Sequence, residues 1–118
     1  MVKTGSQSLV HDMAYKYKWL SLALEDLSQE IGYVYDEFGL AAARRAEVQI
    51  HDGVRQLCQF PKSGVRYDGL HYHENEVRVL HLRKVSIIYS FEDDVIILIA
   101  IWNNYQNPNR LQSVIEAR

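Results

Sequence analysis

Hydrophobic residues between Leu20 and Phe38 recur at alternating steps of four and three, which places them along one face of a helix. The members of this stripe are Leu20, Leu24, Leu27, Ile31, Val34 and Phe38. Ser21 is expected to cap the start of the helix, and Gly39 to end it, because glycine readily adopts the left-handed conformation found after helices. A second helix is expected over residues 40–59, before Pro61, with an inner face of Ala43, Ala46, Ile50, Val54 and Leu57. The single glycine between them predicts an antiparallel helical hairpin.

Outside these helices the pattern changes to that of strands. Aromatic and basic residues alternate over 15–19, as in a strand with one buried face. Three further runs at 76–82, 85–91 and 95–102 are rich in Val, Ile, Leu and Tyr and predict strands. The last run is apolar enough for a central strand covered on both faces. Residues 61–64 and Asp68-Gly69 are typical of turns, and a short helix is expected over 108–117.

This order of elements predicts an α+β fold. An N-terminal strand is followed by an α-helical hairpin packed on a largely antiparallel sheet of about four strands, and by a short C-terminal helix. The 118 residues suit one domain, expected over 13–118, whereas residues 1–12 are expected to be a flexible leader or a remnant of the expression vector.

Composition narrows the class of protein. Cys58 is the single cysteine, which excludes an internal disulfide and disfavours a secreted, disulfide-stapled scaffold. The single cysteine fits a reducing cytoplasm, which is the expected location, and no apolar run is long enough to cross a bilayer. The net charge is −2, but residues 55–84 hold six basic against three acidic side chains. A local positive face and a solvated mixed surface both fit this distribution.

One histidine pair is a candidate metal site. His71 and His73, with Glu74 beside them, would lie on an extended segment, and only His81 or Glu76 is near enough in sequence to complete a zinc site. No cysteine pair supports such a site. We therefore expect neither a metal nor another cofactor.

Several short segments occur in the order known from one family of small proteins. They are Tyr35-Asp36-Glu37-Phe38-Gly39, Ala42-Ala43-Arg44, Ile50, Leu57-Cys58-Gln59-Phe60-Pro61-Lys62-Ser63-Gly64, Glu76-Val77-Arg78-Val79-Leu80, Ile87-Ile88-Tyr89, Asp93-Asp94-Val95-Ile96-Ile97-Leu98 and Gln106-Asn107-Pro108. The fourth is similar to the signature leucine-x-x-phenylalanine-proline-x-x-glycine. Over residues 15–112 the chain thus resembles the RelE/ParE toxins of bacterial type II toxin–antitoxin systems, also known as plasmid stabilisation system proteins.

The resemblance implies a toxin that is neutralised by a cognate antitoxin encoded nearby. RelE-like members cut messenger RNA in the ribosome, and ParE-like members inhibit DNA gyrase. Cleavage of RNA requires cations and groups that transfer protons. The cationic candidates are Arg78, Arg83 and Lys84, and His81 could act as acid or base. Tyr105 is a further candidate, which could stack on a base of the RNA.

The chain departs from the RNA-cutting members at its C-terminal end. Tyr105 stands where many relatives have arginine, and residues 111–118 lack the tyrosine or histidine common in those members. Together with the sequence pI of about 6.2, this favours ParE-like inhibition by binding gyrase over a RelE-like messenger RNA endonuclease. A degenerate, non-toxic binding module is a third alternative.

Two sets of contact residues follow from these expectations. Contacts to the target are expected from Arg78, Arg83, Lys84, Tyr89 and Tyr105. The antitoxin is expected to cover an apolar groove between the hairpin and the sheet, with Trp19, Tyr33 and Trp102 as candidate contacts. A homodimer is compatible with the sequence.

Overall fold

The computed structural model describes residues 15–118, so the leader expected over residues 1–12 lies outside the described part. Its elements follow in the order β1 (Lys16–Trp19), α2 (Ser21–Phe38), α3 (Leu40–Gln59), β2 (Val65–Tyr72), β3 (Asn75–His81), β4 (Val85–Glu92), β5 (Val95–Asn103), the 3-10 turn η1 (Pro108–Arg110) and α4 (Leu111–Glu116). The α+β class and the order of the predicted elements are confirmed.

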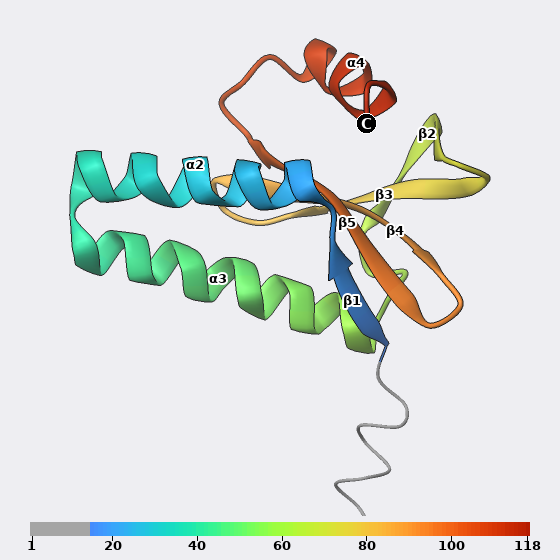
Figure 1. Ribbon diagram of the computed structural model, residues 1–118, viewed down its shortest axis with the longest axis horizontal. Coiled ribbons are helices and arrows are strands. Elements are labelled where there is room, and N and C mark those ends of the chain that lie inside the picture. Colours follow the sequence, from blue (N-terminus) through green and yellow to red (C-terminus); the bar gives the residue numbers. More distant parts are fainter. Residues whose placement is uncertain (1–14) are drawn as a thin grey trace, which may run out of the picture.

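The strands form one mixed, five-stranded sheet in the order β1-β5-β4-β3-β2 (Figure 1). β1 pairs in parallel with β5, and the other neighbours are antiparallel. The expectation of about four strands missed β2. Asp68-Gly69 does not end a strand, because the register between β2 and β3 shifts between Arg66 and His71 and Gly69 takes a φ of 80° there. The turn residues mark an irregularity inside an edge strand.

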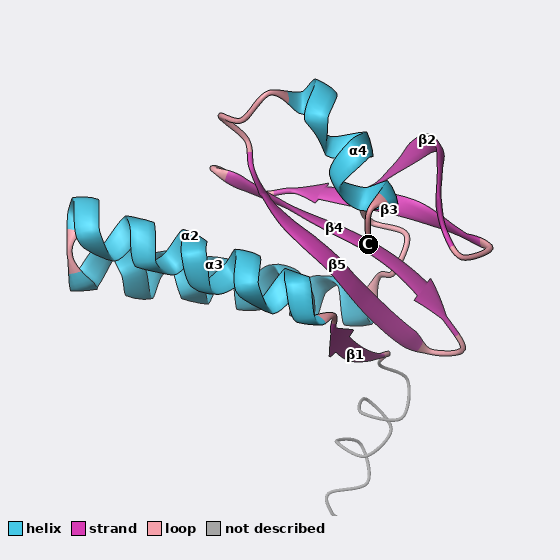
Figure 2. Ribbon diagram, turned by 45° about the horizontal axis from the view of Figure 1, so that its top comes forward, coloured by secondary structure: helices cyan, strands magenta, loops and turns pink. Residues whose placement is uncertain are grey.

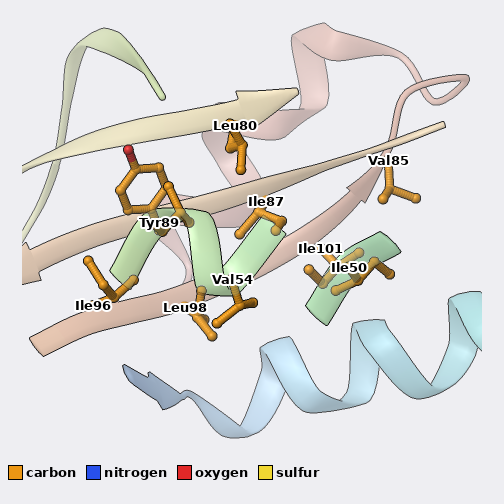
Figure 3. Close-up of a cluster of buried hydrophobic side chains, with 10 residues drawn as sticks. Ile50, Val54, Leu80, Val85, Ile87, Tyr89, Ile96, Leu98 and Ile101 are labelled. Carbon is orange, nitrogen blue, oxygen red and sulfur yellow. The ribbon is translucent and has the colours of Figure 1, made fainter. Parts of the chain in front are cut away.

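The helical hairpin packs against one face of the sheet. Gly39, at a φ of 94°, separates α2 from α3, as predicted. The main core contains Ile50, Val54 and Leu57 of α3 packed on inward-facing strand residues such as Leu98 (Figure 3). The capping role expected of Ser21 is wrong, because the helix begins at this residue and the preceding Leu20 makes no side-chain cap.

The opposite face of the sheet carries α4 (Figure 2). A second cluster joins Leu111 and Ile115 of α4 to strand residues that include Ile99 and Trp102. Because Leu98 belongs to the first cluster and Ile99 to the second, β5 is covered on both faces, as the sequence predicted.

An ion pair ties the C-terminal segment to the hairpin. The Arg118 guanidinium donates to both carboxylate oxygens of Asp26, at 2.6 and 3.1 Å, and to the carbonyl of Ile99 at 2.9 Å. Asp26 also accepts from the backbone N–H of Ile101 at 3.1 Å. The pair is largely buried and connects α2, β5 and the end of the chain.

The predicted apolar stripe of α2 is only partly buried. Leu27, Ile31 and Val34 are half-buried, whereas Leu24 and Phe38 are exposed, the latter to 63%. The far end of the hairpin extends away from the sheet (Figure 1), so residues near Gly39 have little to pack against. This end of the molecule therefore presents apolar side chains to solvent.

Candidate functional site

Arg78 lies on the hairpin side of β3 and holds the loop that joins α3 to β2. Its guanidinium donates to the carbonyls of Lys62 and Gly64, at 3.2 and 2.8 Å, and pairs with Glu76 at 2.9 Å. Only 15% of the side chain is exposed. Most of its hydrogen-bonding capacity is thus used inside the fold, which conflicts with a free cationic role at a target.

Tyr89 completes the same arrangement from β4. Its hydroxyl donates to the Pro61 carbonyl at 2.6 Å and accepts from the Gly64 N–H at 3.0 Å, and the residue is 0% exposed. Burial raises its pKa; the Gly64 hydrogen bond and the Arg78 charge lower it to a smaller extent. The expectation that Tyr89 contacts a target is corrected by the structure, because no surface of Tyr89 is available in this fold.

Arg83 and Lys84 occupy the turn between β3 and β4, beside the helices. The ammonium of Lys84 lies 5.4 Å from the centre of the Phe38 ring, a cation–π distance. Both residues line a groove of about 770 Å³ between the hairpin and the sheet, here called the hairpin groove. It is lined by Glu30, Val34, Phe38, Ala42, Arg44, Arg45, Ala46, Val48, Gln49, Ile50, Asp52, Gly53, Gln56, Leu82, Arg83, Lys84 and Val85.

The charges around the hairpin groove are unbalanced. Within residues 15–118, none of Arg44, Arg45, Arg83 and Lys84 has a carboxylate within 4.0 Å. Of the two acidic residues in the lining, Asp52 pairs with Arg55, whereas Glu30 accepts from the neutral amide of Asn103 at 3.2 Å and keeps its charge, so four cations face one free carboxylate. The groove therefore combines an apolar floor with a cationic rim.

The sequence analysis did not single out Arg44 and Arg45 as site residues. Both lie on α3, far in sequence from Arg83 and Lys84. Their common location arises from the packing of the hairpin beside the β3–β4 turn. The only sequence signal was the pair of adjacent arginines itself.

His81 lies on the other side of the sheet from Arg78. Alternation along β3 directs Val77, Val79 and His81 to one face and Arg78 and Leu80 to the other, and the two core clusters contain these valines and Leu80 separately. His81 lines a pocket of about 400 Å³, here called the sheet pocket. Its lining is Val65, Arg66, Tyr67, Val79, His81, Ser86, Trp102, Asn104, Gln106, Pro108 and Leu111.

The remaining candidates are scattered. Tyr105 is 81% exposed in the loop after β5 and does not line either described groove. Trp19 is half-buried against the main core, and Tyr33 is exposed on α2. Trp102 is 91% shielded and forms part of the sheet pocket, so it does not belong to the hairpin groove where contact with the antitoxin was expected. The three antitoxin candidates therefore do not form one surface.

Other chemistry has little structural support in the described residues. No group of three or more His, Cys, Asp or Glu within residues 15–118 is placed to hold a metal ion. Burial raises the pKa of the Cys58 thiol, which disfavours the reactive thiolate. No described helix is long and apolar enough to cross a membrane.

The RNA-cleavage candidates do not converge. Arg78 is bound to a loop, Arg83 and Lys84 lie at the hairpin groove, and His81 faces the sheet pocket. Acid–base cleavage requires a proton acceptor, a proton donor and cations around one phosphate. The structure does not bring these candidates together around one phosphate.

Residues 17–108 match the family model described as ParE toxin of type II toxin-antitoxin system, parDE. Among solved structures, a chain described as the chromosomal ParDE TA system from P. aeruginosa is similar, with 22% sequence identity and a TM-score of 0.63. The similarity covers 77% of this chain and 97% of that chain, and at this identity it shows the fold. A search of curated proteins found no match.

Proposed function

Because the chain belongs to the ParE toxin family of type II toxin–antitoxin systems, we propose that it inhibits growth by binding DNA gyrase, without a chemical step of its own. The observation that supports this proposal is the separation of the side chains that RNA cleavage would need on one phosphate. His81 faces the sheet pocket, whereas Arg83 and Lys84 line the hairpin groove. A binding toxin needs no such convergence.

Family membership also implies a cognate antitoxin. The hairpin groove supports the proposal that the antitoxin docks there, because it has apolar walls and four cations without carboxylate partners within the described chain. An amphipathic segment with acidic side chains would complement both features. Tyr33, exposed on α2, is an additional contact candidate of this proposal.

Induced expression in a bacterial host tests the target. Growth arrest with intact messages and loss of plasmid negative supercoiling would support gyrase inhibition. Arrest with new cuts in translated messages, detected by primer extension, would overturn the proposal in favour of the endonuclease. Unhindered growth with folded protein present would identify a non-toxic binding module.

Charge reversal tests the docking surface. The double variant Arg83→Glu/Lys84→Glu should weaken capture of the antitoxin encoded next to this gene by at least about tenfold, since each reversed charge faces an acidic segment. The matched control is Lys16→Glu/Lys18→Glu on β1, where both side chains are exposed and outside the groove. Equal loss in both double variants would point to net charge rather than to the groove.

A further inference from the structure

The sheet pocket lies apart from the hairpin groove and has no part in the proposed function. It is bounded by strands on one side and by the loop after β5, which runs into α4, on the other. More than half of its lining residues are apolar or aromatic: Val65, Tyr67, Val79, Trp102, Pro108 and Leu111. Its volume of about 400 Å³ lies within the range of small-ligand pockets.

A chain of hydrogen bonds at the pocket fixes the tautomer of His81. Ser86, which is buried, donates its hydroxyl hydrogen to Oδ1 of Asn104 at 2.6 Å. The orientation of the Asn104 amide is set by its other end, where Nδ2 donates to the Leu82 carbonyl at 3.4 Å. With its one hydrogen engaged, the Ser86 oxygen can only accept from His81, whose Nδ1 lies 2.8 Å away.

The neutral imidazole of His81 therefore carries its proton on Nδ1. Its other nitrogen, Nε2, is left as an acceptor. Within residues 15–118, Nε2 has no hydrogen-bond partner. The other polar lining residues are Ser86 and Asn104, which are engaged in this hydrogen-bond chain, Arg66, which pairs with Glu76, and the exposed Gln106. The pocket thus offers one oriented acceptor beside its apolar residues.

This combination selects for a particular ligand chemistry. An indole has a large apolar ring system and a single polar group, a ring N–H that only donates. A nucleobase carries several donors and acceptors that need partners, whereas Ser86 and Asn104 of the lining are already hydrogen-bonded within the fold. An indole, with its apolar rings and single N–H donor, therefore complements a pocket that has apolar walls and one acceptor.

We infer that the sheet pocket binds the indole of a tryptophan side chain presented by a partner protein, with the indole N–H donating to His81 Nε2. The open mouth favours a tethered side chain over a free small molecule. His81, Asn104 and Arg66 are all exposed at this rim, so the peptide carrying the tryptophan can continue into solvent. The Nε of Arg66 pairs with Glu76 at 3.2 Å and with Asp68 at 3.7 Å, and its terminal nitrogens are left to donate to a backbone carbonyl of that peptide.

The first test uses small probes on the full chain and does not depend on toxicity. N-acetyltryptophanamide should bind with a dissociation constant of about 1 mM or tighter and shift the NMR signals of Trp102 and His81. The analogue methylated on the indole nitrogen should bind at least about tenfold more weakly, because it has no N–H to donate. Equal binding of the two probes, or no binding of either, would overturn the inference.

Two further probes separate the alternatives. Bare indole binding more tightly than N-acetyltryptophanamide would replace the partner protein by a small molecule and overturn the inference. Tighter binding of adenosine monophosphate would do the same in favour of a nucleotide. Weaker binding of both supports a tryptophan side chain.

Variants test the hydrogen-bond chain itself. Ser86→Ala should remove the tautomer preference of His81, which is visible in long-range ¹H–¹⁵N spectra of the imidazole, and should weaken binding of N-acetyltryptophanamide severalfold. His81→Ala should remove the difference in affinity between N-acetyltryptophanamide and its N-methylated analogue. The matched control is His71→Ala, at an exposed histidine on β2 outside the pocket, and it should change neither the tautomer of His81 nor the affinity for either probe. A retained preference for the unmethylated probe in His81→Ala would contradict the assigned acceptor.

Discussion

Replacing Tyr89 by phenylalanine removes one oxygen atom from the fully buried junction between β4 and the loop after α3. That oxygen donates to the Pro61 carbonyl and accepts from the Gly64 N–H. Gly64 is buried, so its N–H loses its partner without access to water, whereas Pro61 is half-buried and its carbonyl can be partly hydrated. One unpaired buried group costs about 1–3 kcal/mol, so we expect Tyr89→Phe to lower the free energy of unfolding by about 2 kcal/mol.

The measurement is denaturant unfolding, together with the melting temperature. For a chain of this length, about 2 kcal/mol corresponds to a decrease of about 6–12 °C. Tyr105→Phe is the matched control, because its hydroxyl is on a side chain that is 81% exposed, and it should stay within about 0.5 kcal/mol of the wild type. Equal stabilities for the two variants would refute the argument that Tyr89 serves the fold.

Four other outcomes follow from the packing. Arg118→Ala should lower the free energy of unfolding by about 2–4 kcal/mol, because it leaves Asp26 without its cation in a largely buried site. It should also speed hydrogen exchange in α4, and unchanged exchange there would argue that the ion pair does not hold the C-terminal segment. Gly64→Ala should destabilise the fold more than Gly53→Ala. A Cβ at Gly64 would lie 2.9 Å from a backbone oxygen, whereas at Gly53 it meets only the ends of side chains. The urea midpoints of the two variants test this order. Cys58, with its pKa raised above 9.0, should react with iodoacetamide at pH 8.5 more slowly in the folded chain than in urea. Because the folded chain keeps a proton that the unfolded chain releases above pH 9.0, this residue also lowers stability as the pH rises from that value.

The sequence predicted most of the fold because its periodicities are strong and local. The two helices of the hairpin end as expected, α2 at Phe38 before Gly39 and α3 at Gln59, and the apolar run in β5 is covered on both faces. The strand β2 was missed because Asp68-Gly69 has turn chemistry, although here it belongs to an irregularity within a strand. Whether these two residues form a turn or an irregularity within a strand depends on pairing with β3, and the local sequence pattern carries no information on that pairing.

The candidate site was predicted less well than the fold. Arg78 and Tyr89 were read as contacts with a target, but their partners lie in the loop after α3, and only the folded chain brings these together. The cationic rim of the hairpin groove combines residues of α3 with residues of the β3–β4 turn. The hydrogen bond between Ser86 and Asn104 connects β4 to the loop after β5. Contacts over such separations follow from topology and register rather than from composition.

We propose that this ParE family chain acts by binding gyrase and not by cutting RNA. Supercoiling of relaxed plasmid by purified gyrase, with the purified chain added in increasing amounts, tests it most directly. If the chain binds gyrase, supercoiling should fall as the dose rises and should be restored when the cognate antitoxin is added first. Undiminished supercoiling, together with cleaved messages in a translating extract that received the same preparation, would contradict it.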